Sequence, residues 1–415
     1  MKQLFTRILG IEISYTTKVE DFIKHKGPKI TYTKQPLQSE FFIRSNELLF
    51  EQGINDIQIT MGTWEDVPCF FSAGDRSTIP FDIFSASFYL LSRYEEYLPH
   101  IKDVHGRFSP KESIAYKYNF LQLPIVEIWA FKFFEKLRER FPEVKLVQKK
   151  YQYTSIIDVT SSHGFAHKGL VRSIAGVFLD LSSFKIRRMI RRILVWTRIR
   201  KDPYDNFAFL IALHKEKAIQ SMFFFLFAEY STYDKNVSPN NNKFKYLIKS
   251  IADYSIVSLA TSYVSFGNID LLKKEKKRLA NVINRPINCS RARYNRVDIP
   301  ETYRDLVTAE FTDDYTMGYT HEIGFRAGTS VPFYFYDILL EVQQPIRVHP
   351  FAIHDYALRD FKHKEEILTH LSSIHKRLKE VNGHFVTIFS NELLGGEHPV
   401  DWKDLYQSVI EKYAV

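Results

Sequence analysis

Residues 153–160 read YTSIIDVT, a short apolar run that ends close after an acidic residue, and a helical pattern follows over about 168–181. Strands that alternate with helices are typical of βα units, which build a mostly parallel sheet or barrel. The same alternation continues in QSMFFFLFA (220–228), a helix near 240–253, YSIVSLATSY (254–263), the charged helix NIDLLKKEKKRLANVI (268–283), FTDDYTMGY (311–319), IRVHPFAIH (346–354), a helix at about 362–381 and HFVTIFSNEL (384–393).

The sequence before Lys150 has a different character, with short apolar runs between turn residues. IQITMGTWEDVPCFF (57–71) alternates apolar and polar side chains in its first half, as a half-buried strand does. Helices are predicted within PFDIFSASFYLLSRYEEYLP (80–99) and PIVEIWAFKFFEKLRERF (124–141). We therefore expect a smaller α+β domain over 1–150 and the βα units over 151–415.

In parallel α/β folds, functional side chains gather at the carboxyl ends of the strands. The neighbours Asp313 and Asp314 point to opposite faces of a strand, which excludes them as an acid/base pair. The polar or small residues near predicted strand ends are Asp158, Ala260, Asp313, Asp314, Arg326, His354 and Asn391.

The composition is that of an ordinary globular protein, with 415 residues, 45% hydrophobic and 25% charged. Aromatic residues reach 15%, which suits large cores and a sugar-facing cleft. Cys69 and Cys289 are far apart and indicate neither a metal motif nor a disulfide framework. The first residues lack the pattern of a signal peptide, and no apolar run is long enough to span a membrane. We expect a cytoplasmic protein.

The net charge of +9 is concentrated in KIRRMIRRILVWTRIRK (185–201), which has eight Lys or Arg and no acid. It predicts a basic, partly amphipathic helix over 183–201, inserted into the second domain at about 182–201. Such a helix either packs on the body with solvated arginines or lies at an anionic surface, here the inner membrane. Nucleic acid is the least favoured partner. The candidate binding residues are Arg187, Arg188, Arg191 and Arg192.

Two histidines, His163 and His167, follow the opening strand at a spacing that places both on one face of a helix. Together with Asp158 they would form a set of two histidines and one carboxylate that holds a divalent metal. Gly164 and Phe165 between them indicate a loop instead. His349 and His354 form another loose pair, which we interpret as structural.

Several phrases together resemble the polysaccharide deacetylase (NodB-homology) family, in the two-domain form common in Bacteroidetes. The phrases are PFDIFSASFYLLSRYEEYLP (80–99), DVHGRFSPKESIAYK (103–117), FLQLPIVEIW (120–129), IDVT (157–160), KDPYDNFAFL (201–210), SRARYNRVDIPETYRDL (290–306), DDYTMGYTHEIGFRAGTSVPFYFYD (313–337) and NELLG (391–395). The resemblance implies a distorted (β/α) barrel behind a smaller α+β domain. It also implies metal-assisted hydrolysis of a sugar N-acetyl group.

Two positions keep the family's residue types. Asp158 matches the base that activates water, and Arg326, in GFRAGT, matches the arginine that supports this base.

Four other positions depart from the family pattern. Thr160 stands where relatives place a second Asp, Ala260 and Arg293 where they carry metal-binding or nearby histidines, and Ser390 where they carry the acid His. A methyl group cannot bind a metal, and a hydroxyl is a poor substitute for a carboxylate or an imidazole. We therefore expect no metal cofactor.

These observations favour a deacetylase-like protein of surface carbohydrate metabolism that has lost catalysis and binds a glycan, a glycosyl-lipid or a partner enzyme. A first alternative is an active N-deacetylase that uses Asp158 with His163 or His167 and a zinc-like metal. A second alternative is an interaction module that the basic helix anchors to a membrane surface.

Overall fold

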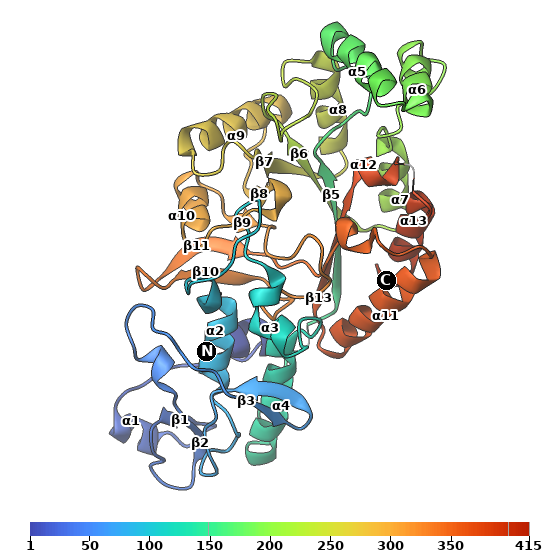
Figure 1. The fold of residues 1–415 in the computed structure, drawn as a ribbon. Helices are drawn as coiled ribbons and strands as arrows, with labels where there is room; N and C mark the ends of the chain where they lie inside the picture. Colours follow the sequence, from blue (N-terminus) through green and yellow to red (C-terminus); the bar gives the residue numbers. More distant parts are fainter. Residues whose placement is uncertain (148, 397, 415) are drawn as a thin grey trace.

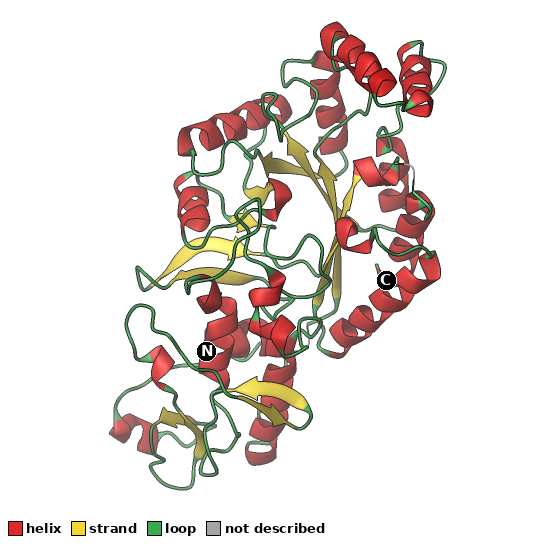
Figure 2. Cartoon of the chain, in the orientation of Figure 1, coloured by secondary structure: helices red, strands yellow, loops and turns green. Residues whose placement is uncertain are grey.

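The computed structural model describes residues 1–147, 149–396 and 398–414. It confirms the predicted fold class, since a curled nine-stranded sheet forms a half-barrel with helices packed around it (Figures 1 and 2). The strand order is β10-β11-β9-β8-β7-β6-β5-β13-β12, and every neighbouring pair is parallel except β10 with β11. The strands are β5 (Gln152–Val159), β6 (Gln220–Leu226), β7 (Ile256–Thr261), β8 (Cys289–Ala292), β9 (Asp313–Asp314), β10 (Phe333–Asp337), β11 (Val342–Val348), β12 (Ile353–His354) and β13 (His384–Ser390).

The central strands are buried on both faces, which explains their continuous apolar runs. Side chains alternate between two cores because successive residues of a strand point to opposite faces. Ile157 and Phe223 face the covering helices, whereas Ile156 and Phe224 belong to a second cluster inside the half-barrel. Asp158, two residues after Ile156, therefore points into this interior.

Helices follow most of these strands and cover the outer face of the half-barrel (Figure 1). Asn241 and Asn268 cap the first turns of α8 and α9 with their side-chain oxygens, which fixes where those helices begin. The helices are α7 (Phe207–Glu216), α8 (Asn242–Ala252), α9 (Ile269–Ile283), α10 (Glu301–Thr308), α11 (Lys364–Glu380), α12 (Asn391–Leu394) and α13 (Trp402–Tyr413).

The N-terminal segment has a hydrophobic cluster of its own around Trp129 and Phe133. Asp82 accepts hydrogen bonds from two backbone amides and caps α2, so this helix begins at Ile83, just after Pro80. The strand expected early in 57–71 begins only at Met61. The elements are a π-helix (Gln3–Leu9), α1 (Val19–Lys24), β1 (Ile30–Thr33), β2 (Phe41–Arg44), β3 (Met61–Trp64), β4 (Val67–Phe70), α2 (Ile83–Leu91), α3 (Ile114–Lys117) and α4 (Ile125–Arg140). The domain boundary at residue 150 stays a prediction.

The basic stretch forms α6 (Ile186–Trp196), shorter than the predicted 183–201, and it pairs with α5 (Leu170–Ser182). The two helices, which we call the α5–α6 hairpin, project at the end of the molecule away from the N-terminal segment (Figure 1). Gly176 of α5 allows their close approach, because a Cβ there would lie 2.3 Å from the Arg192 guanidinium. No helix within the described ranges is both long and apolar enough to cross a bilayer.

Candidate functional site

The interior of the half-barrel contains a buried ion pair between Asp158 and Arg291. The Nε of Arg291 donates to both carboxylate oxygens at 2.8 and 2.9 Å, and its Nη1 donates to the Tyr315 carbonyl at 2.8 Å. Burial opposes ionisation of Asp158, but Arg291 and the nearby His354 outweigh it and lower the pKa of the carboxyl to about 2. Asp158 is therefore a fully ionised, neutralised group and a weak proton acceptor.

Arg291, a residue of β8 (Cys289–Ala292), was not among the site residues predicted from the sequence. In the sheet register Arg291 is the partner of Ala260, and both side chains lie at the interior, where the small Ala260 belongs to the inner cluster. The Arg291 guanidinium lies 5.0 Å from the centre of the Phe351 ring. A charged side chain on the buried face of a strand requires an internal partner, and this requirement was the available clue.

The hydroxyls at the altered positions already have partners. Thr160 Oγ1 donates to the Glu392 carboxylate, and Ser390 Oγ donates to Asp355 at 2.7 Å. Arg293 lies at the mouth, 3.4 Å from the Asp234 carboxylate, and donates to the Tyr233 carbonyl at 3.0 Å. Both hydroxyls are thus oriented toward carboxylates, Ser390 Oγ also accepts from the Leu393 amide at 3.3 Å, and the Arg293 guanidinium has no lone pair for a metal.

The residues around Asp158 do not fit the divalent metal that the family resemblance implies. Both carboxylate oxygens accept from Arg291, and the neighbouring positions carry a methyl group and engaged hydroxyls. Within the described residues, no group of three His, Cys, Asp or Glu side chains is arranged to hold a metal ion. Asp158, His163 and His167 do not form such a group in the described part of the chain, and their use as metal ligands stays a prediction.

His163 and His167 lie on a loop and not on a helix. Their rings contact edge to face, with centroids 4.8 Å apart, and His163 Nδ1 lies 3.1 Å from the Ser162 hydroxyl. Asp202 fixes this loop, because its carboxylate accepts hydrogen bonds from the backbone N–H groups of three consecutive residues at 2.7 to 2.8 Å. These three residues are Gly164, Phe165 and Ala166.

Arg326 does not support Asp158, contrary to the expectation from the family pattern. Its guanidinium donates to both carboxylate oxygens of Glu96, at 2.8 and 2.5 Å, and Arg93 donates to the same carboxylate at 2.8 Å. All three groups are buried, and the two arginines lower the pKa of Glu96 to about 2 against the effect of burial. Arg326 therefore connects the barrel to the N-terminal segment.

The paired residues Asp313 and Asp314 have separate partners, as their opposite faces predict. Asp313 accepts from Arg347 and lies 2.7 Å from His349 Nε2, whereas Asp314 accepts from the hydroxyls of Ser290 and Thr316. His354 Nε2 lies 3.7 Å from Asp158, so this histidine belongs to the interior site.

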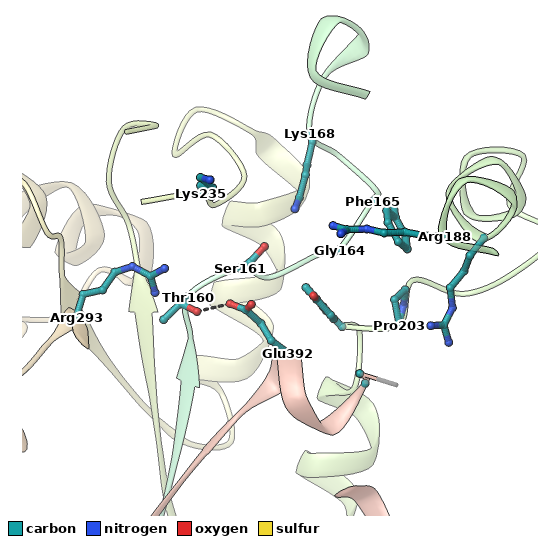
Figure 3. Close-up of a pocket in the computed structure, with 14 residues that line it drawn as sticks. Thr160, Ser161, Gly164, Phe165, Lys168, Arg188, Pro203, Lys235, Arg293 and Glu392 are labelled. Atoms are coloured by element: carbon teal, nitrogen blue, oxygen red, sulfur yellow. Dashed lines mark hydrogen bonds between the residues drawn. The ribbon is translucent and has the colours of Figure 1, made fainter. Parts of the chain in front are cut away.

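A pocket of about 410 Å³ opens at the carboxyl ends of β5 and β13, next to the interior ion pair. Lys168 and Arg293 point toward Thr160 and Ser161 from opposite sides of it (Figure 3). Glu392 supplies the one carboxylate among the described lining residues. The cations that line this pocket, which we call the mouth pocket, are Lys168, Arg188, Arg191, Lys235 and Arg293.

Aromatic rings adjoin the mouth pocket through Arg293, whose guanidinium lies 4.8 Å from the centre of the Tyr294 ring. Tyr233 and Tyr263 rings are 4.2 Å apart, and the His105 ring lies 4.6 Å from Tyr294. We call Tyr233, Tyr263, Tyr294 and His105 the tyrosine cluster. Tyr233 is 41% exposed, so the cluster presents an apolar surface to solvent.

The four arginines predicted to bind a surface have different environments. Arg192 is buried and clasps α5 to α6 through Asp180, at 2.9 Å from Nε and 2.7 Å from Nη2, so its expected surface role is wrong. Arg188 and Arg191 line the mouth pocket, and Arg187 is exposed. We expected all four arginines to be exposed to solvent. Asp180 in the preceding helix was the sequence feature that could have indicated a buried partner for Arg192.

The α5–α6 hairpin exposes an unusual number of large apolar side chains. Phe178 is 67% exposed and Phe184, in the turn between the helices, is 88% exposed. Exposed apolar patches of this kind mark interaction surfaces. The exposed set is Ile174, Phe178, Leu179, Leu181, Phe184, Ile186, Ile190, Ile193 and Trp196, and the exposed Ile199 follows just after the hairpin.

Comparisons with known proteins give a partial picture. Residues 1–142 match the model of a family of unknown function (DUF7033), and no curated protein matches the chain. The solved structures it resembles include a probable polysaccharide deacetylase from Pseudomonas aeruginosa PAO1, with 12% identity, a TM-score of 0.40, and 64% of this chain and 86% of that chain covered. PuuE allantoinase has 11% identity, a TM-score of 0.39 and coverage of 63% and 83%. The polysaccharide deacetylase Bc1974 from Bacillus cereus has 13% identity, a TM-score of 0.31 and coverage of 63% and 86%.

Proposed function

We propose that this chain is a carbohydrate-binding protein of surface-polysaccharide metabolism that retains a deacetylase-type barrel without its metal-assisted hydrolysis. The observation that carries the proposal is the pairing of Asp158 with Arg291. A guanidinium supplies permanent positive charge but no vacant coordination position, so it neutralises the carboxylate without activating water. The protein acts by binding a glycan or glycosyl-lipid, alone or beside an active partner enzyme.

The tyrosine cluster supports a saccharide ligand. Aromatic faces pack against the apolar C–H faces of sugar rings, while tyrosine hydroxyls and nearby arginines offer hydrogen bonds to sugar hydroxyls. The cluster lies beside the mouth pocket, as expected for a ligand that extends from one to the other.

Two measurements on the purified full-length chain test this proposal. The first is zinc content after dialysis against zinc, together with acetate release from N-acetylated chitooligosaccharides. We expect no stoichiometric zinc and no acetate. Stoichiometric zinc that is lost in Asp158→Asn, with acetate release, would establish an active hydrolase and overturn the proposal.

The second measurement is the affinity for the same oligosaccharides. Loss of an aromatic contact in Tyr263→Ala should weaken binding about tenfold, in line with the energies of buried aromatic contacts. Tyr118→Ala is the matched control, since Tyr118 is half exposed and lies outside the cluster. Equal affinities of the two variants would remove the cluster from the binding surface.

As a second candidate function we propose attachment to an anionic membrane surface through the α5–α6 hairpin. The favouring observation is the row of exposed apolar side chains flanked by Arg187, Lys185 and Arg198. Apolar residues enter the boundary between headgroups and acyl chains while cations bind anionic lipids, which is the pattern of interfacial helices. The protein would then work in the cytoplasm at the inner membrane.

Flotation with phosphatidylglycerol-containing liposomes tests the attachment. The combined change Phe178→Ser and Phe184→Ser should abolish flotation, whereas Ile101→Ser and Val104→Ser, which alter equally exposed apolar residues elsewhere, should leave it unchanged. Flotation of the Phe variant at the level of the unmodified chain would exclude the hairpin as the anchor.

A further inference from the structure

The mouth pocket is a half-open cavity with a strongly basic lining. Five cations face it and one carboxylate, Glu392, opposes them. Glu392 already accepts a hydrogen bond from Thr160. Of the five cations, Arg293 has Asp234 at 3.4 Å and Arg188 has Asp180 at 3.5 Å, both within ion-pair distance, and Arg191 also has an interaction partner. The described lining residues therefore carry more positive than negative charge.

Lys168 is a partly buried cation of this pocket. Among the described residues, the Lys168 ammonium has no hydrogen-bond acceptor and no carboxylate within ion-pair distance. Burial lowers its pKa to about 8, although Glu392 acts in the opposite direction. A buried ammonium that lacks a partner costs free energy, and a bound anion would remove that cost.

The charges come from separate parts of the chain, so a run of basic sequence does not explain them. Lys168 belongs to the loop after β5, Lys235 to the loop after β6, Arg293 follows β8, and Arg188 lies on α6. The Asp202 carboxylate fixes the loop that carries Lys168 through three backbone hydrogen bonds. A pre-organised set of cations loses little entropy on binding an anion.

Size and charge select the kind of anion. A volume of about 410 Å³ holds one small headgroup and is too small for a nucleic-acid duplex. Arginine forks and lysine ammonium groups together match a phosphate, which has several oxygens and more charge than a single carboxylate. The tyrosine cluster beside Arg293 would accept the group that carries the phosphate.

We propose that the mouth pocket binds the phosphate ester of a saccharide, with the phosphate among Lys168, Lys235 and Arg293 and the sugar toward the tyrosine cluster. This inference rests on the proposed saccharide-binding function and names its ligand class. The ester exists either as a free sugar phosphate or as the headgroup of a lipid-linked sugar, and both present the same chemistry to the pocket.

Isothermal titration calorimetry of the full chain with N-acetylglucosamine 1-phosphate, and with N-acetylglucosamine as the uncharged match, tests the assignment. The phosphate should bind at least about tenfold tighter, because charge-assisted hydrogen bonds exceed neutral ones. Lys168→Gln and Arg293→Gln should each reduce that affinity about tenfold, whereas Lys274→Gln, an exposed lysine of α9, should not. Thermal melting checks that each variant is folded, and Lys235→Gln provides an exposed pocket variant that cannot disturb the core.

Equal binding of the two sugars, or equal affinity in all variants, would overturn the phosphate assignment and leave the proposed saccharide binding intact. Acetate release from N-acetylated oligosaccharides would overturn the proposed function whatever the phosphate result. Co-sedimentation with phosphatidylcholine vesicles that contain a polyprenyl-phosphate sugar separates the sources. If free N-acetylglucosamine 1-phosphate does not compete with vesicle binding, the lipid-linked ester binds outside the pocket. That result would count against the lipid-linked sugar as the ligand of the pocket.

Discussion

The interior ion pair and the mouth pocket lie next to each other at the same end of the barrel, yet they treat charge in opposite ways. In the interior, Asp158 and Arg291 neutralise one another and both are buried. In the mouth pocket, the described lining has five cations and one carboxylate, and Lys168 has no ion-pair partner in the part of the chain that the structure describes. A site whose charges are satisfied within the chain stabilises the fold, whereas a site with surplus charge is arranged for something that the chain itself does not contain.

Removing the cation of the interior pair should have the largest effect. Arg291→Met leaves the Asp158 carboxylate buried and unpaired, so the free energy of unfolding should fall by about 3 to 5 kcal/mol. Urea denaturation measures this loss. The double variant Arg291→Met with Asp158→Asn should recover part of it, and no recovery would mean that Arg291 stabilises the protein through other contacts.

Acid should weaken the same pair. The pKa of Asp158 is lowered to about 2 in the folded chain, so its contribution is complete above the ordinary carboxyl range and is lost as pH falls toward that value. A shift of this size corresponds to about 2 kcal/mol. The difference in unfolding free energy between the unmodified chain and Asp158→Asn should therefore shrink by about 2 kcal/mol between about pH 6 and about pH 2. A constant difference would show that Asp158 is not held ionised by Arg291.

In the mouth pocket, removal of a cation should stabilise the fold instead of destabilising it. Lys168→Met removes a desolvated ammonium that has no ion-pair partner among the described residues, and it should raise the free energy of unfolding by roughly 1 kcal/mol, after allowance for the solvent that still reaches it. The melting temperature without ligand reports this gain. Destabilisation by Lys168→Met would mean that the lysine is part of the fold and not of a binding site.

The smallest effect is expected at the rim. Arg188 is more than half exposed, so Arg188→Gln should change the unfolding free energy by less than about 0.5 kcal/mol. Arg192→Gln, on the same helix, should cost more, because it breaks the buried clasp with Asp180. Equal costs for the two changes would contradict the different roles assigned to these neighbours.

The sequence predicted the fold well where one strand can be judged by itself. The apolar runs of β5, β6, β7 and β13 and the periodic helices α8, α9 and α11 lie close to their predicted ranges. β8 was missed because its four residues include Arg291, and β10 because it lies inside a longer phrase without alternation. Short strands depend on their neighbours in the sheet, and their own composition says little about them.

The candidate site was predicted only in part, for a related reason. Asp158 could be placed at the end of a strand from local pattern alone. Its partner Arg291 could not, since the contact crosses the interior of a curled sheet and depends on the register between Ala260 and Arg291. Arg326 was misassigned because its partner, Glu96, lies in the N-terminal segment, 230 residues away.

The clasp between Arg192 and Asp180 also bears on how the hairpin behaves. Because it joins α5 to α6, we expect the two helices to tilt together, and they carry the pocket residues Arg188 and Arg191. A tilt of the hairpin would then change the width of the pocket, and a ligand that draws those arginines inward would favour one tilt. By thermodynamic reciprocity, a surface beneath the hairpin and a small anion behind it would each alter the affinity for the other by the same factor.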